Sequence, residues 1–164
     1  MTTDYTITRL DIAYQGLTEL PEDIHLYTSL AVLQCNDNML TSLDRLLPLA
    51  NLTHVYCQKN RLTLLDHLPP NIVLINCTYN QIQSLDHLPP NLSILYCYSN
   101  EISTLDNLPL DLLELYCSDN QLTSLDYLPA SLTDMYCGIN PLYYDFIPSL
   151  ENIRRSVYNG PVLK

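Results

Sequence analysis

The chain has 164 residues, of which 47% are apolar, and it carries 18 acidic residues against seven Lys and Arg, for a formal charge of −11. This length fits one domain with a sizeable core, and no apolar run approaches the roughly 18 residues that a membrane-spanning helix needs. The acidic balance argues against nucleic acid and anionic membrane as partners, because phosphate binding requires clustered Lys and Arg.

The N-terminal segment begins Met-Thr-Thr-Asp-Tyr-Thr, which lacks the basic and apolar stretches of a Sec-type signal peptide. We therefore expect a cytoplasmic protein, in its own cell or in a host cell. A divergent first unit starts at Ile7 and places Leu10, Ile12 and Leu17 where later units repeat apolar residues.

From residue 30 onward one phrase recurs at a nearly fixed period. Its cysteines lie at positions 35, 57, 77, 97, 117 and 137, so the last five are 20 residues apart. The clearest copy contains, in order, Leu92, Leu95, Cys97, Asn100, Ile102, Leu105, Asp106, Leu108 and Pro109. Self-similarity at this period predicts stacked supersecondary units, here seven strand-bearing units of which the first is divergent.

This phrase resembles the leucine-rich repeat, whose signature L-x-x-L-x-L-x-x-N/C-x-L matches six copies between Leu30 and Leu142. The period and the Leu-Pro near each repeat end resemble the short-repeat subclass of secreted effectors from Gram-negative pathogens, and similar chains are encoded by giant viruses. The resemblance implies a viral or bacterial, effector-like protein. The chain departs from the effector pattern by placing Asp at positions 44, 66, 86, 106 and 126, where Pro is usual, and by lacking a ligase domain before Lys164.

Within each repeat the residues predict a short strand followed by a tight connecting segment. We call this segment, which leads from one strand to the next, the return. Leu95 and Cys97 alternate with Ile94, Tyr96 and Tyr98, which is the period of two expected of a strand with one buried face. The return holds too many prolines for a helix, so we expect an extended, polyproline-like convex side. The predicted fold is a leucine-rich-repeat horseshoe over residues 1–146, with a parallel sheet on its concave face.

After Asn140 the repeat pattern gives way to helical spacing. Leu150, Ile153 and Val157 recur as on one helix face, and Gly160-Pro161 ends the pattern. We expect residues 147–164 to form a helical cap over the last repeat, with Arg154 and Arg155 on its exposed side. No capping helical hairpin is recognisable at the other end, so we expect the first repeat to be either partly open or covered by another subunit or a fusion partner.

The repeated polar residues and cysteines have structural explanations. The cysteines occupy inward strand positions, where free Cys behaves as a small apolar residue, and the asparagines are expected to satisfy backbone groups of adjacent turns. The aspartates at positions 44, 66, 86, 106 and 126, one in each of five repeats, form an Asp column. Each is expected to cap the turn that follows it, and the alternative role is calcium binding. His67 and His87 stand beside two of these aspartates and suggest a metal site, but their column continues as Asn and Tyr, which favours solvated histidines. No catalytic motif is present, and we predict no enzyme activity, metal or cofactor.

Charge and outward strand positions point to a protein partner. Between Leu62 and Ile153 there are eleven acidic residues and no Lys or Arg. This stretch would attract a partner protein with a basic surface. Tyrosine, enriched in binding hot spots, fills outward positions among these acids. The candidate partner-binding residues are Tyr56, Tyr96, Tyr98, Glu114, Tyr116, Asp119, Asp134 and Tyr136. The alternative interpretation is that the acidic residues only keep the solenoid soluble and the tyrosines only shield the sheet.

These features predict a non-enzymatic protein-binding module that uses its concave face. The second interpretation is a structural or self-assembling component, such as a virion or multimer part, that associates through exposed repeat ends. The third, the targeting half of a ligase system, needs a catalytic domain that this sequence lacks.

Overall fold

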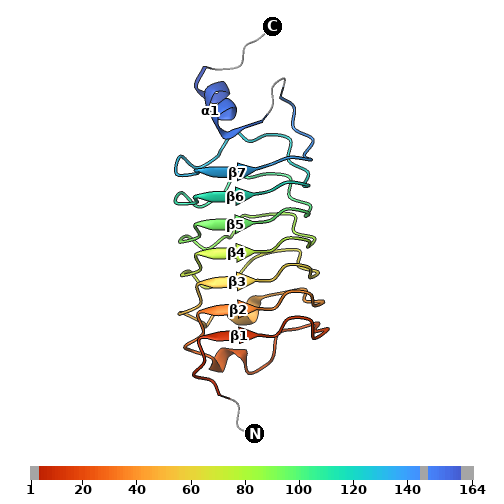
Figure 1. Ribbon diagram of the computed structural model, residues 1–164, viewed down its shortest axis with the longest axis vertical. Helices are drawn as coiled ribbons and strands as arrows, with labels where there is room; N and C mark the ends of the chain where they lie inside the picture. Colours follow the sequence, from red (N-terminus) through yellow and green to blue (C-terminus); the bar gives the residue numbers. More distant parts are fainter. Residues whose placement is uncertain (1–3, 145–147, 160–164) are drawn as a thin grey trace.

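A computed structural model describes residues 4–144 and 148–159, the last four of these by their backbone only. Within these residues seven strands form one parallel sheet in chain order, as Figure 1 shows. The strands are β1 (Arg9–Asp11), β2 (Val32–Gln34), β3 (His54–Tyr56), β4 (Leu74–Asn76), β5 (Ile94–Tyr96), β6 (Glu114–Tyr116) and β7 (Asp134–Tyr136). The predicted solenoid fold is therefore confirmed, and its termini lie at opposite ends.

The inner strands β2 to β6 bury their middle residue, which is only partly buried in the terminal strands β1 and β7, and every strand turns its first and third residues outward. Val55, Ile75 and Leu95 have no exposed surface, and the residues on either side of them are half-buried. Strands pair in register, so that Leu95 lies beside Ile75 in one neighbour and Leu115 in the other. One continuous core of stacked apolar layers results, and the cysteine after each strand from β2 onward belongs to it.

The asparagine column holds consecutive repeats together, as its regular spacing predicts. Asn60 donates from Nδ2 to the carbonyls of Cys35 and Cys57, each at 3.0 Å, and its Oδ1 accepts from the N–H of Leu40 at 2.9 Å. The same three bonds recur at Asn120. Buried backbone groups that no strand can pair are satisfied in this way.

The returns differ between the first two repeats and the later ones. Two 3₁₀ helices, η1 (Ile24–Leu26) and η2 (Asp44–Leu46), occur in the first two returns, so the expected extended convex side is wrong there. These repeats are the longer ones, and their two or three extra residues accommodate one tight 3₁₀ turn. Between β3 and β7, a stretch described throughout, the returns contain no helix and close with turns such as that from Pro89 O to Leu92 N at 3.1 Å.

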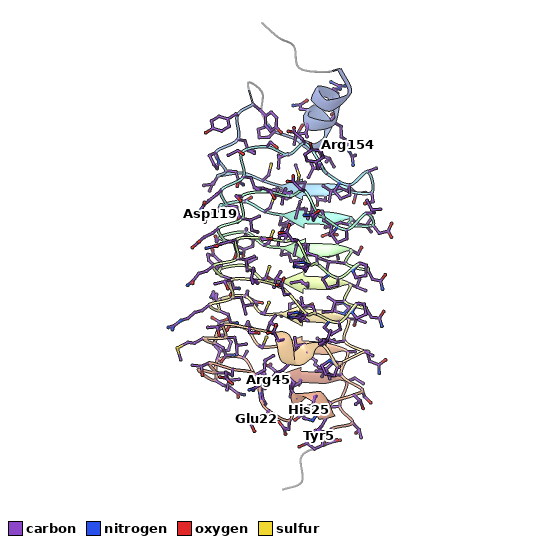
Figure 2. The ribbon with its side chains drawn as sticks, turned by 180° about the vertical axis from the view of Figure 1, so that it is seen from behind. Tyr5, Glu22, His25, Arg45, Asp119 and Arg154 are labelled. Carbon is purple, nitrogen blue, oxygen red and sulfur yellow. The ribbon has the colours of Figure 1, made fainter. Side chains whose placement is uncertain are left out.

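The two ends of the solenoid are covered differently. The helix α1 (Leu150–Asn159) lies at the C-terminal end (Figure 1), and Ile153 is buried at 2% exposure within the core. Arg154 lies near the last strands (Figure 2), where its guanidinium donates to the carbonyls of Ala130 at 3.1 Å and Leu132 at 2.7 Å. Arg154 is exposed, as expected, and its long side chain also reaches back to the last return, a contact that the sequence did not predict.

Some expectations about the C-terminal segment fall outside the described residues. They are the boundary at 146–147, the side chain of Val157 and the helix stop at Gly160-Pro161. Over the part of the chain that the structure covers, we find no helix with both the length and the apolar character needed to cross a bilayer.

Candidate functional site

The outward side chains of the strands form a surface that we call the sheet face, made up of the first and third residue of each strand. At the third position the column reads Asp11, Gln34, Tyr56, Asn76, Tyr96, Tyr116 and Tyr136. The sequence analysis placed these residues on one face, and the register brings them into one row. Adjacent strands lie about 4.8 Å apart in such a sheet, so consecutive residues of the row are neighbours on the surface.

Three tyrosines of the last repeats stack into a ladder. The ring centroids of Tyr96 and Tyr116 are 4.8 Å apart, and those of Tyr116 and Tyr136 are also 4.8 Å apart, with interplanar angles of 39° and 68°. Such tilted and edge-on arrangements are the favourable ones for aromatic pairs. Tyr136, at the end of the ladder, remains 59% exposed.

Two carboxylates are bonded to this ladder by tyrosine hydroxyls. Tyr96 Oη donates to Glu114 Oε2 and Tyr116 Oη donates to Asp134 Oδ2, each at 3.1 Å. Desolvation, and then the hydrogen bond to the carboxylate, raises the pKa of both Tyr96 and Tyr116. The hydroxyls are therefore held as neutral donors, and their bonds order the tyrosine–carboxylate ladder.

Among the described residues, the carboxylates of the ladder form no ion pair. Glu114 and Asp134 are directly paired positions on β6 and β7, an arrangement in which like charges repel. None of the ion pairs formed between described residues includes Glu114, Asp119 or Asp134. A cation that approached this surface would gain attraction without first breaking an internal ion pair.

The remaining predicted site residues lie near the ladder without joining it. Tyr98 makes an edge-to-face contact with Tyr79, with centroids 5.3 Å apart, and Asp119 accepts a 2.7 Å bond from Ser99 Oγ. Tyr56 is separated from Tyr96 in the row by Asn76. The structure thus brings together Tyr96, Tyr116, Tyr136, Glu114 and Asp134, and places the other three beside or beyond them.

The sequence analysis did not foresee the bonds that link tyrosine to carboxylate. Both join a tyrosine at the third strand position to an acid 18 residues later, at the first position of the next strand. That spacing is visible in the sequence once the register is known. Val73 and Leu113, which precede β4 and β6, are exposed apolar residues (37% and 44%) that were not among the predicted site residues.

The histidine and aspartate columns lie on the returns and connect consecutive repeats. His87 Nδ1 is 3.0 Å from Asp66 Oδ1, His67 Nδ1 is 3.4 Å from Asp44 Oδ1, and Asn107 donates to Asp86 at 2.7 Å. These carboxylates therefore bond side chains of the next repeat, which differs from the turn capping that the sequence suggested. Among the described residues, no three His, Cys, Asp or Glu side chains converge as metal ligands would.

The six cysteines form a second ladder, inside the core. All six are free and buried, and burial raises the pKa of Cys35 and Cys77 to about 12. Cys57 and Cys77 donate from sulfur to the carbonyls of Asn76 and Tyr96, each at 3.4 Å. Thiols held neutral in this way are poor nucleophiles, in agreement with their predicted structural role.

Comparison with solved structures identifies the repeat architecture. The leucine-rich repeat domain of APL1B is 25% identical, with a TM-score of 0.71 over 83% of this chain and 43% of that chain. YopM from Yersinia enterocolitica is 27% identical, with a TM-score of 0.62 over 83% of this chain and 39% of that one. The functional domain of InlJ from Listeria monocytogenes, which includes a cysteine ladder, is 29% identical, with a TM-score of 0.62 over 95% and 40%.

This chain thus spans about two fifths of the length of each of these three structures. No family model and no curated protein matches the sequence. The likeness to known proteins is therefore carried by the parallel-strand solenoid and its repeat of about 20 residues.

Proposed function

Since the chain has the leucine-rich-repeat fold, we propose that it is a non-enzymatic protein-interaction module that binds a partner protein on its sheet face. Its structural neighbours include the leucine-rich repeat domain of a Shigella effector, and this fold suits the presentation of a long surface to another protein. The observation that carries the proposal is the tyrosine–carboxylate ladder on β5, β6 and β7, which has exposed aromatic surface and unneutralised charge at the same place.

The chemistry of the ladder favours a partner that presents Arg or Lys. Tyrosine rings attract cations through their faces, and Glu114 and Asp134 add charges that the chain itself leaves without an ion pair among its described residues. The prior ordering of the tyrosine hydroxyls lowers the entropy that binding must overcome. The surrounding stretch, with eleven acids and no Lys or Arg, attracts a basic surface from a distance.

The proposal is tested by affinity capture from eukaryotic and bacterial lysates, with three forms of the chain as bait. Glu114→Gln/Asp134→Asn removes two charges from the ladder while preserving side-chain shape. Asp106→Asn/Asp111→Asn removes the same charge from exposed residues outside the strands. We expect the wild type and the second variant to retain a partner that the first variant binds about tenfold more weakly, and we expect binding to weaken as salt is raised.

A further variant, used as a fourth bait, tests the aromatic rings. Tyr96→Ala/Tyr116→Ala/Tyr136→Ala, used only if circular dichroism shows it folded, is expected to lose the same partner. Equal recovery of the partner by all baits would refute a binding site on the ladder, and it would point to the returns or the repeat ends instead.

A further inference from the structure

The N-terminal edge of the sheet is open. β1 pairs with β2 alone, whereas an inner strand such as β3 bonds on both sides, from His54 N to Ala31 O at 3.0 Å and from Cys57 N to Asn76 O at 2.8 Å. The far edge of β1 has no strand partner among the described residues. Unpaired backbone N–H and C=O groups along an edge are a template for another strand.

At the C-terminal end, the helix α1 bonds the last return. Ser131 Oγ donates to the carbonyls of Leu110 and Leu112, each at 2.7 Å, and in the last repeat Arg154 donates to the equivalent carbonyls of Ala130 and Leu132. Arg154 thus supplies the bonds that a further repeat would supply. Among the described residues β7 also pairs with one strand only, β6, so the two ends differ in what bonds the terminal return and not in the number of strand partners.

Among the described residues of the N-terminal segment, Tyr5 closes the core behind β1, and none forms a strand pair with β1. Tyr5, at the N-terminal end of the molecule (Figure 2), packs edge-to-face on Tyr27 with centroids 4.9 Å apart and donates to Asp23 at 2.8 Å. Arg9 and Asp11 nevertheless remain exposed and Leu10 partly so. Arg9 bonds Gln34 Oε1 at 2.7 Å, so its side chain leans over β2 and away from the outer edge.

The sequence of β1 is complementary to itself. Arg9 and Asp11 flank Leu10 on the same face. In an antiparallel pair centred on Leu10, Arg9 of each copy lies opposite Asp11 of the other, and the two Leu10 residues lie opposite each other. Two favourable charge pairs therefore form at once. A foreign strand that carries one sign of charge satisfies only one of these residues.

We propose that two copies of this chain pair edge to edge through β1, antiparallel and about a two-fold axis at Leu10, so that one sheet continues from one copy into the other. This interface is separate from the tyrosine–carboxylate ladder at the opposite end of the sheet and goes beyond the proposed function. A three-residue strand offers a small contact area, so the pairing is weak and depends on concentration.

The test is sedimentation equilibrium of the full chain over a wide concentration range. The weight-average mass of the wild type is expected to rise from 18.8 kDa towards twice that value. Arg9→Asp and Asp11→Arg each place like charges opposite one another at two points, and each is expected to weaken association at least about tenfold. Arg61→Asp, a reversal of the same size on an exposed residue outside β1, is expected to associate like the wild type.

Two rescue experiments separate pairing through β1 from a general effect on folding. An equimolar mixture of Arg9→Asp and Asp11→Arg chains is expected to form a heterodimer, because one edge then carries two acids and the other two bases. The double variant Arg9→Asp/Asp11→Arg, which also loses the Arg9–Gln34 bond, is expected to associate like the wild type. A wild type that stays at 18.8 kDa throughout overturns the proposal, as does association that the single reversals leave unchanged or that neither rescue restores.

Discussion

At the residue scale, every repeat has left-handed backbone at one shared position, two residues after its cysteine or, in the first repeat, after Ile12. The residues at this position have φ between 54° and 57°, although none is glycine: Tyr14, Asp37, Lys59, Tyr79, Ser99, Asp119 and Ile139. Asp and Asn adopt this conformation more readily than other residues, and a β-branched residue is a steric outlier there. Ile139 is therefore the strained member of the column, and its side chain is 82% exposed, so burial does not offset the strain.

We predict that Ile139→Asn stabilises the protein. Asparagine tolerates the left-handed conformation, and we expect a gain of about 1 kcal/mol in the free energy of unfolding, which raises Tm by roughly 2–4 °C for a chain of this size. Urea and thermal unfolding measure both quantities. Ile139→Val keeps the branched Cβ and should leave stability unchanged. A fall in stability for Ile139→Asn would show that the isoleucine side chain makes contacts that matter more than its backbone strain.

At the element scale, α1 ends the solenoid by making contacts that a further repeat would otherwise make. Ile153 fills the apolar layer that a next strand would fill, and Arg154 takes the two carbonyls that a next return would take. Arg155 points elsewhere and pairs with Glu151 at 2.8 Å, both side chains being exposed. Adjacent arginines on one helix therefore have different roles, and this makes them a matched pair for mutation.

We predict that Arg154→Gln loosens the last repeat and leaves the first ones intact. Loss of two hydrogen bonds from a charged donor should lower local stability by about 1–2 kcal/mol, so that amides of β7 exchange with solvent roughly 5–30 times faster. Hydrogen exchange read by mass spectrometry tests this, with β2 and β3 as internal references. Arg155→Gln removes only an exposed pair, worth less than about 0.5 kcal/mol, and should change little. Equal effects of the two variants would contradict the capping role.

The accuracy of the sequence analysis follows from what is periodic in this molecule. The strands, their register, the buried cysteines and the row that contains Tyr96 and Tyr116 repeat every 20 residues, and so they could be predicted. The 3₁₀ turns depend on two or three extra residues in single repeats, and the contact of Arg154 depends on how a helix docks against a return. The hydroxyl bonds to Glu114 and Asp134 depend on side-chain rotamers, which no repeat pattern determines.

At the scale of the whole molecule, the buried thiols couple folding to pH. Desolvation raises the pKa of Cys35 and Cys77 from 9.0 to about 12, and it raises the pKa of the other four cysteines as well. Between those values the unfolded chain releases thiol protons that the folded chain retains. The thiols' contribution to stability is therefore complete below pH 9 and is lost as the pH rises towards 12.

We predict steep alkaline unfolding that begins just above pH 9. Each thiol should lower the free energy of unfolding by about 1.4 kcal/mol per pH unit, and six act together. Urea titrations under reducing conditions at several pH values between 8 and 10.5 give the slope. Cys77→Ala/Cys97→Ala should reduce the slope by about a third, whatever its effect on stability at pH 7. A slope that the double variant leaves unchanged would show that other groups govern the alkaline transition.

The manner in which the array ends bears on how such a chain can change length. α1 binds its last return through Arg154 and two backbone carbonyls, and backbone carbonyls are the same in every unit. Duplication or deletion of one whole 20-residue unit leaves an equivalent pair for the helix to hold, since each unit contacts only its neighbours. A partial unit would instead move an asparagine away from the carbonyls that it bonds. The chain can thus gain or lose whole 20-residue units, and the sequence of the C-terminal helix need not change when it does.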